Sequence, residues 1–335
     1  MFSLFFLPST QGGRRGRAGR ALLWLAVLAA LVVYGGTATR LGQLNIMGTV
    51  FLYVVLTQAW NILGGYGGYL NFGTVTFFGT GAYASAVLFH YFGISPFVSA
   101  PLAGLVAALL GILIGIPTLR LRGAYFAVVT MIITFAMQVL ALDLPFTQGA
   151  LGIYLQPPKM SPLALERMFY FLLLGFAVLV TLLVYLVEHS NFGWALVAIR
   201  EDEDAAEIIG VRTTRIKWIA NAVGTFIMGA AGSLYAQRIL YLEPTGTFSF
   251  DISLNVVLMA VIGGAGTWQG PLIGAPLVLL VADALRITFT SEVNRVIFSL
   301  VVIAVALFVP GGVMSVFSKL SERLTRKRET GTESR

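Results

Sequence analysis

Apolar residues run through this chain in long blocks that are separated by short polar or glycine-rich intervals. A helix needs roughly 20 apolar residues to cross a bilayer, and most of the blocks approach that length. The blocks occupy residues 21–37, 45–63, 73–93, 97–117, 123–141, 168–187, 218–238, 253–264, 270–289 and 293–311. The pattern predicts an all-α, polytopic membrane protein with about ten transmembrane or partly spanning helices, of which 253–264 is too short to span alone.

The composition supports a single membrane domain. The chain is 57% hydrophobic and 11% charged, and its mean hydropathy is +0.86, outside the range of soluble domains. The longest polar interval, 188–217, is too short to bury a core of its own. We therefore expect a basic cytoplasmic N-terminus (1–20), a transmembrane domain (21–312) and a basic cytoplasmic tail (313–335). The basic-then-apolar start is interpreted as an uncleaved first helix.

The positive charges predict the orientation of the helices. The formal net charge is +7, and 16 of the 22 Lys and Arg fall in the N-terminus, the loops 118–122 and 188–217, and the tail. Ten spans with both termini inside would place these four regions on the cytoplasmic side, as the positive-inside rule requires. The charge is therefore attributed to membrane orientation and not to nucleic-acid binding.

Two glycine clusters interrupt the apolar pattern. Seven glycines lie between residues 64 and 81, and VIGGAGTWQGPLIGA at 261–275 carries five more before and around Pro271. Backbone that leaves a helix at membrane depth must be buried in protein or line a wet cavity, and transporters build binding regions from such interrupted segments. The clusters indicate glycine-rich broken segments along a transport path. A glycine-rich cytoplasmic turn is the alternative for 64–68.

Enzyme chemistry and ion coupling find little support in the sequence. The chain has no cysteine and two distant histidines, and it shows no metal-spaced cluster, nucleophile motif or phosphate-binding loop. Ionisable groups inside spans are costly and usually functional, but Asp283 is the clearest one here, and Arg286 lies three residues on, where it can pair with it. We expect no catalytic residue, no metal and no cofactor on this chain.

The inner loop carries the most informative polar stretch. Its middle, AIREDEDAAEIIGV (198–211), predicts a short amphipathic helix with Ala198, Ala205, Ile208 and Ile209 on its apolar side. Gly210 is expected to end this helix. A helix this short is marginal alone, so we expect it to gain stability against a partner. A solvated connector is the alternative.

These residues resemble a known family. Asp204-Ala205-Ala206-x-x-x-Gly210 is similar to the E-A-A-x-x-x-G element of import permeases of the ATP-binding cassette (ABC) class, with Asp in place of Glu. The run 192–236 resembles the coupling-loop region of the branched-chain amino-acid permease family. The stretches 65–86, 117–138 and 253–275 agree in order and spacing, so the resemblance extends from about residue 45 to 312.

The resemblance implies partners and an energy source. It implies a homologous second permease subunit, two cytosolic ATPase subunits that bind ATP, an extracytoplasmic substrate-binding protein, and a bacterial or archaeal cytoplasmic (inner) membrane. Arg212, Arg215 and Lys217 would either face acidic groups of the ATPase or serve the positive-inside rule. The residues implied in coupling to the ATPase are Arg200, Glu201, Asp204, Ala205, Ala206, Glu207 and Gly210.

The resemblance leaves the cargo open. At 145–153 the family commonly has T-G-G and a further glycine, whereas this chain has Thr147-Gln148-Gly149, so branched-chain amino acids, other amino acids, urea and short amides all stay candidates. Tyr125 is assigned to the path with packing as its alternative. The residues expected along the substrate pathway are Asn61, Gly64, Gly65, Tyr66, Gly67, Gly68, Asn71, Thr74, Tyr125, Thr130, Gly263 and Gly264.

The sequence thus predicts a permease subunit of an ABC importer. The alternatives are an ion-coupled secondary carrier or channel for a small polar solute and, with the least support, a membrane-embedded enzyme.

Overall fold

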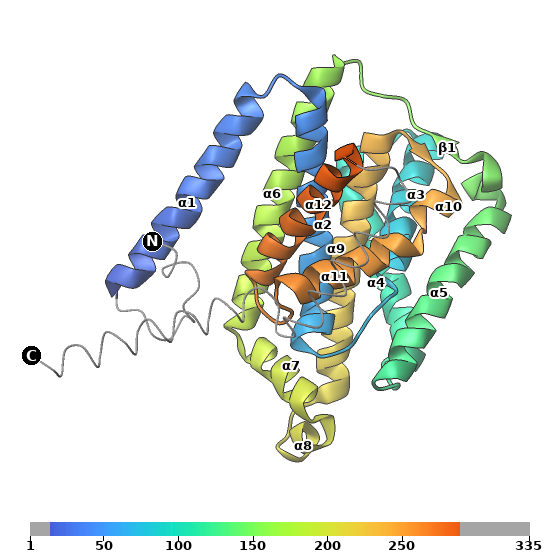
Figure 1. The fold of residues 1–335 in the computed structure, drawn as a ribbon. Coiled ribbons are helices and arrows are strands. Elements are labelled where there is room, and N and C mark those ends of the chain that lie inside the picture. Colours follow the sequence, from blue (N-terminus) through green and yellow to red (C-terminus); the bar gives the residue numbers. More distant parts are fainter. Residues whose placement is uncertain (1–13, 95, 289–335) are drawn as a thin grey trace, which may run out of the picture.

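Helices account for most of the part of the chain that the computed structural model describes, residues 14–94 and 96–288 (Figure 1). The long helices are α1 (Arg14–Thr37), α2 (Leu41–Asn61), α3 (Thr74–Phe92), α4 (Pro96–Thr118), α5 (Ala124–Asp143), α6 (Pro162–Glu188), α9 (Thr213–Ile239), α11 (Phe250–Gly263) and α12 (Gly270–Thr288). The predicted all-α class is confirmed, and the predicted run 293–311 lies outside the described residues.

Short elements connect these helices. A π-helical turn, η2 (Ile62–Tyr66), extends α2, and 3-10 turns η3 (Pro145–Thr147) and η4 (Gly149–Leu151) follow α5. Strands β1 (Ile153–Tyr154) and β2 (Tyr241–Leu242) pair antiparallel, with Ile153 opposite Leu242. The remaining short helices are α7 (Asn191–Glu201), α8 (Glu203–Ile208) and α10 (Pro244–Thr247).

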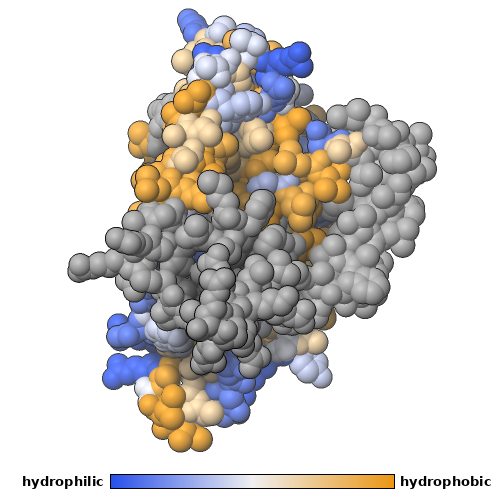
Figure 2. All heavy atoms as spheres, turned by 60° about the vertical axis from the view of Figure 1, so that its left-hand side comes forward, coloured by the Kyte–Doolittle hydropathy of each residue, from blue (hydrophilic) through white to orange (hydrophobic). Residues whose placement is uncertain are grey.

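Six helical segments among the described residues are long and apolar enough to cross a membrane: Leu41–Tyr66, Val98–Thr118, Ala124–Asp143, Pro162–Glu188, Thr213–Ile239 and Pro244–Gly263. Most of the long helices run back and forth along one direction, with α7 and α8 at one end and the β1–β2 pair at the other (Figure 1). On the face drawn in Figure 2, hydrophilic residues gather near both ends, with hydrophobic residues between them. This distribution fits a protein surrounded by lipid along its middle.

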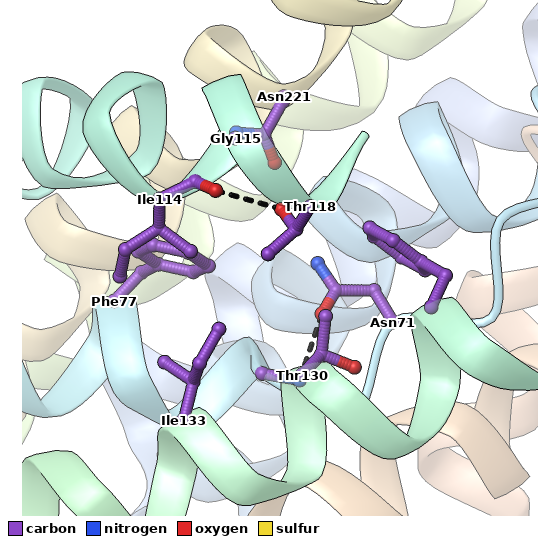
Figure 3. Close-up of a pocket in the computed structure, with 10 residues that line it drawn as sticks. Asn71, Phe77, Ile114, Gly115, Thr118, Thr130, Ile133 and Asn221 are labelled. Carbon is purple, nitrogen blue, oxygen red and sulfur yellow. Dashed lines mark hydrogen bonds between the residues drawn. The ribbon is translucent and has the colours of Figure 1, made fainter. Parts of the chain in front are cut away.

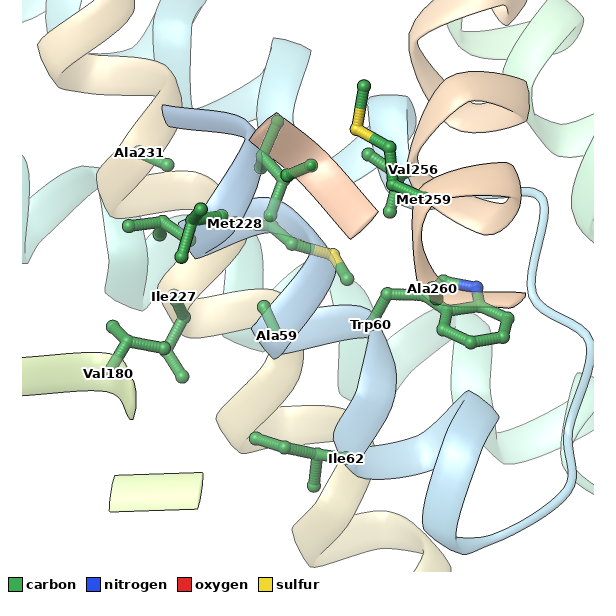
Figure 4. Close-up of a cluster of buried hydrophobic side chains, with 14 of the residues drawn as sticks. Ala59, Trp60, Ile62, Val180, Ile227, Met228, Ala231, Val256, Met259 and Ala260 are labelled. Atoms are coloured by element: carbon green, nitrogen blue, oxygen red, sulfur yellow. The ribbon is translucent and has the colours of Figure 1, made fainter. Parts of the chain in front are cut away.

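Helix α2 forms the centre of the bundle. Ala59 and Trp60 of α2 pack with Met228 of α9 and with Met259 of α11, and Val180 of α6 closes the cluster (Figure 4). The central position explains why the run Leu41–Tyr66 is mostly buried, whereas only a fifth of the window in α5 is. In Figure 1, α5 stands at one edge of the bundle and α1 at the other.

Small residues bring α3, α4 and α9 into close contact. A Cβ placed on Gly81 of α3 would overlap the backbone of Gly229, and one on Gly111 of α4 would press on Thr225. Small residues at helix interfaces permit this approach in membrane proteins. Gly79 and Gly81 therefore belong to regular helix packing, and the interruption expected around the first glycine cluster is confined to residues 67–73.

Candidate functional site

The first glycine cluster changes the course of the chain at the end of α2. Gly64 and Gly65 lie in the buried π turn, and residues 67–73 have no regular structure. Gly68 has a φ of +75°, a left-handed conformation that suits glycine. The indole Nε1 of Trp60 donates to the carbonyl of Asn71 at 2.7 Å, and the backbone N–H of Gly73 donates to Asn71 Oδ1 at 2.7 Å. The first bond holds the irregular segment against α2, and the second fixes the turn within the segment.

The second glycine cluster meets the first. Residues 264–269 join α11 to α12, and Asn61 Nδ2 donates to the carbonyl of Thr267 at 2.9 Å while the N–H of Gly266 donates to Asn61 Oδ1 at 2.8 Å. Gln58 Nε2 donates to the carbonyl of Trp268 at 2.8 Å. A Cβ on Gly65 would lie only 2.5 Å from the nitrogen of Gly266. We call residues 61–68 together with 264–268 the junction.

A narrow cavity lies beside the first irregular segment (Figure 3). Asn71, Thr118, Thr130 and Asn221 bring polar groups to it from the 67–73 segment and from α4, α5 and α9. Thr130 Oγ1 also accepts from the backbone N–H of Phe72 at 3.1 Å. Its enclosed space is about 10 Å³, room for no more than about one water molecule. It is lined for small polar groups but is tight for a solute.

The inner loop contains two short helices in place of the single one predicted over 198–210. Helix α7 ends at Glu201 and α8 begins at Glu203, because Asp202 adopts an extended conformation and its carboxylate accepts from the N–H of Ala205 at 3.0 Å. An aspartate in this position caps a new helix. Gly210, with a φ of +93°, follows α8 as expected. The prediction of one continuous helix was wrong at the capping residue.

The break rearranges the apolar face predicted for the loop. Ala206 is buried, whereas Ile208 and Ile209 are 86% and 76% exposed. Figure 2 shows a hydrophobic patch at the tip of the molecule where α7 and α8 lie in Figure 1. Glu207 accepts a hydrogen bond from the Thr213 hydroxyl, and the exposed Glu201 pairs with Arg200 at 2.9 Å. The loop therefore presents two isoleucines to its surroundings.

Glu203 is the centre of an ionic network that ties the loop to the bundle. Its Oε1 accepts from Lys217 Nζ at 2.5 Å, and its Oε2 accepts from the Tyr69 hydroxyl at 2.8 Å and lies 3.2 Å from Arg122 Nε. Lys217 Nζ also donates to Tyr69 Oη and to the carbonyl of Leu119, both at 3.0 Å. The network joins α8, α9, the segment after α2 and the loop after α4.

The network also determines the ionisation of its acids. Burial would raise the pKa of Glu203, but hydrogen bonds from Lys217 and Tyr69, with the charges of Lys217 and Arg122, lower it below its ordinary value. Arg122 forms a two-bond contact with the exposed Asp204, and this hydrogen bonding lowers the pKa of Asp204. Lys217 is buried, so it is not available to a partner, contrary to one of the two roles expected for it.

The other pathway candidates fall in several places. Tyr66 and Thr74 are buried, whereas Tyr125 is 77% exposed on α5 and does not line the cavity. Gly263 ends α11, and Gly264 follows it with a φ of +121°. The side chain of Arg286, expected to pair with Asp283, lies outside the described residues.

The sequence analysis did not single out several residues that connect the two glycine clusters with the inner loop. They are Gln58, Tyr69, Arg122, Glu188 and Glu203, all polar or charged side chains. A buried charge requires a partner. Lys217, directly before the apolar run 218–238, was therefore the one available signal that a buried ion pair lies at this end of the bundle. The partner itself is not encoded by local sequence.

Comparisons with known proteins give the family. Residues 42–307 match the family described as "Branched-chain amino acid transport system / permease component". The high-affinity branched-chain amino acid transport system permease protein LivM of Salmonella typhimurium and that of Escherichia coli are each 31% identical over 310 residues, which cover 84% of this chain and 72% of the relative.

A more distant relative is the probable branched-chain amino acid transport permease protein LivH of Methanocaldococcus jannaschii. It is 24% identical over 76% of this chain and 85% of its own length. No solved structure matches this chain with significance. The match over most of the helical bundle, including both glycine clusters and the inner loop, shows that the chain belongs to the family of branched-chain amino acid transport permeases.

Proposed function

We propose that this chain is a membrane-spanning subunit of an ABC importer that moves branched-chain amino acids into the cytoplasm. Membership of the permease family is the observation that carries the proposal. Partner ATPase subunits would bind and hydrolyse ATP, a homologous permease would complete the translocation unit, and an extracytoplasmic binding protein would deliver the solute. This division of labour agrees with a sequence that has neither a phosphate-binding loop nor a run of ionisable groups in its apolar segments.

We place the chain in a bacterial or archaeal cytoplasmic membrane, with ten spans and both termini inside. In this arrangement α7 and α8 face the cytosol together with the loop around Arg122, as the positive charges require. The irregular segments 67–73 and 264–269 would then lie near the inner end of the path. Their buried backbone groups are bonded to protein, which satisfies the requirement for non-helical backbone in that environment.

The exposed isoleucines support a docking role for the inner loop. Ile208 and Ile209 lie at the end of the molecule occupied by α7 and α8, away from the apolar middle of the bundle (Figures 1 and 2). Exposed apolar side chains rimmed by polar ones are typical of protein interaction sites. We assign them, with Arg200, Glu201, Asp204, Ala205, Glu207 and Gly210, to contact with an ATPase subunit. Ala206, which was also expected there, is buried in the hydrophobic core and supports α8 from inside.

The substrate path is proposed to pass the polar cavity and the junction. Asn71 and Thr130 face the cavity. Their amide and hydroxyl groups can form hydrogen bonds with the ammonium and carboxylate groups of an amino acid, which carries no net charge and therefore needs few charged side chains along its path. Broken helices add backbone dipoles to such a site. Because the cavity is too narrow for an amino acid, we interpret this arrangement as a closed state of the path.

Uptake by the reconstituted complex tests the proposal. Vesicles that contain this chain with its partner permease, ATPases and binding protein are expected to accumulate radiolabelled leucine only when ATP is present at the ATPases. Urea and acetamide serve as competing cargo probes. Replacing both exposed isoleucines by aspartate is expected to abolish ATP-driven uptake, whereas replacing both by valine preserves it. Uptake that needs no ATP and survives the aspartate changes would instead indicate an ion-coupled carrier or a channel.

A further inference from the structure

One glutamate connects the two sides of the junction. Glu188 is the last residue of α6, and its Oε2 accepts from the hydroxyl of Tyr66 at 2.5 Å and from the backbone N–H of Trp268 at 2.9 Å. Tyr66 belongs to the first glycine cluster and Trp268 to the second, about 200 positions along the chain. A single carboxylate oxygen therefore holds the two clusters together.

An arginine near the C-terminal end of α7 reaches the same place. Arg200 NH1 donates to the carbonyl of Gly65 at 3.3 Å, and a Cβ on Gly266 would lie 2.9 Å from this NH1. A Cβ on Gly68 would lie 2.5 Å from Cγ of the same arginine. The glycines thus leave room for the arginine side chain, which packs across both clusters.

The two charged residues are mechanically linked. Two residues separate Glu188 from the start of α7. In this short turn, the Ser190 hydroxyl accepts from the N–H of Gly193 at 3.2 Å. Arg200 lies near the other end of α7. A displacement of α7 consequently moves both Glu188 and Arg200 relative to α2 and to the 264–268 segment.

The energetics make Glu188 the stronger of the two contacts. Hydrogen bonds to an ionised group are shorter and roughly twice as strong as neutral ones. The carboxylate of Glu188 accepts two such bonds, whereas the contact of Arg200 with Gly65 is long, and Arg200 is shared with Glu201. Loss of the Glu188 charge leaves the Trp268 N–H and the Tyr66 hydroxyl with at most a neutral, weaker acceptor.

We propose that Glu188 is a positioning residue that clamps the π turn of α2 to the 264–268 segment and transmits movement of the inner loop to both. Arg200 supports the clamp from the far end of α7. The inference rests on the proposed transport function, because it assigns to Glu188 the step that converts displacement of α7 into opening of the junction. Neither residue lines the cavity, so the role is mechanical.

The first experiment compares ATP hydrolysis with uptake. In the complete reconstituted complex, Glu188→Gln is expected to keep the rate of ATP hydrolysis within about twofold of that of the unchanged complex. The amount of leucine taken up per ATP should fall by about tenfold, because weakening a hydrogen bond to a charged group changes an equilibrium by about this factor. Tyr66→Phe retains the ring, removes one donor, and is expected to lower this ratio by about threefold. Glu243→Gln, the same chemical change on an exposed residue after β2, serves as the matched control.

The outcomes separate this inference from the proposed function. An unchanged complex that takes up no solute with ATP refutes the proposed function. A coupled unchanged complex in which Glu188→Gln and Tyr66→Phe keep the full ratio of uptake to hydrolysis overturns the clamp. Parallel losses of hydrolysis and uptake in both variants would also overturn it, since they indicate a structural role only.

A second measurement needs neither cargo nor ATP. The chain contains no cysteine, so a single Leu63→Cys places one thiol in the buried π turn. In inside-out vesicles, adding Glu188→Gln is expected to raise the rate of labelling by a membrane-impermeant maleimide by about tenfold, whereas Glu243→Gln leaves the rate unchanged. Equal rates with and without Glu188→Gln would overturn the clamp whatever solute is carried.

Discussion

Replacement of Lys217 by methionine should open the inner loop. Lys217 and Glu203 have side chains that are 6% and 10% exposed, with 2.5 Å between Nζ and Oε1. Methionine keeps most of the aliphatic length but removes the charge and the bonds to Glu203, Tyr69 and Leu119. The variant therefore leaves a buried carboxylate with Arg122 as its remaining cationic neighbour.

The expected size follows from the geometry. Removal of one member of a buried ion pair typically costs about 3–5 kcal/mol, and the retained Arg122 places Lys217→Met at the low end, about 3 kcal/mol. This energy corresponds to an increase of roughly 150-fold in the equilibrium constant for local opening. Adding Glu203→Gln removes the unpaired charge and should recover most of the loss.

Hydrogen exchange of the amides in 203–217, measured on the purified chain in nanodiscs, reports this opening. Lys217→Met should raise exchange by roughly 150-fold, and Lys217→Met with Glu203→Gln should exchange more slowly than Lys217→Met alone. Asp204→Asn, whose side chain is 72% exposed, is the matched control and should exchange at nearly the unchanged rate. The reasoning is refuted if Lys217→Met exchanges within threefold of the unchanged chain, or if adding Glu203→Gln speeds exchange further.

Three further predictions follow from the same contacts. The pKa of Glu203 is lowered in the folded chain, so its contribution to inner-loop stability is complete above its ordinary pKa of 4.5 and is lost as the pH falls through the lowered value. The hydrogen-exchange rates of the unchanged chain and of Glu203→Gln should therefore converge on acidification. A difference between the two rates that grows as the pH falls would contradict this sign. Gly81→Ala should destabilise the bundle by about 3 kcal/mol in SDS titrations, because the added Cβ meets the backbone of Gly229. The control Gly175→Ala, whose Cβ would have nothing within 4 Å, should be neutral or stabilising by up to about 1 kcal/mol. Equal effects of the two variants would count against the close packing of α3 on α9. Asn61→Ala should cost about 2–4 kcal/mol in the same titrations, since Gly266 and Thr267 lose their partner, and a cost below about 1 kcal/mol would show that the junction is held elsewhere.

The apolar runs by themselves located the long helices of the described residues. Nine of the predicted runs coincide with helices of the described part of the chain, because a span of apolar residues must satisfy its backbone within its own helix in lipid. Local signals also located the irregular segments and the inner loop. They missed the break at Asp202, where a side-chain cap overrides the helical pattern.

Only the tertiary structure decided what these segments touch. The sequence placed Glu188 just after an apolar run, but its two donors lie 122 positions before it and 80 positions after it. The same holds for Lys217 and Glu203, whose pairing gives a buried lysine where the sequence allowed an exposed one. Hydropathy depends on neighbours along the chain, whereas hydrogen bonds between distant segments depend on how the helices pack, so the connection between the inner loop and the junction had to be found in the folded protein.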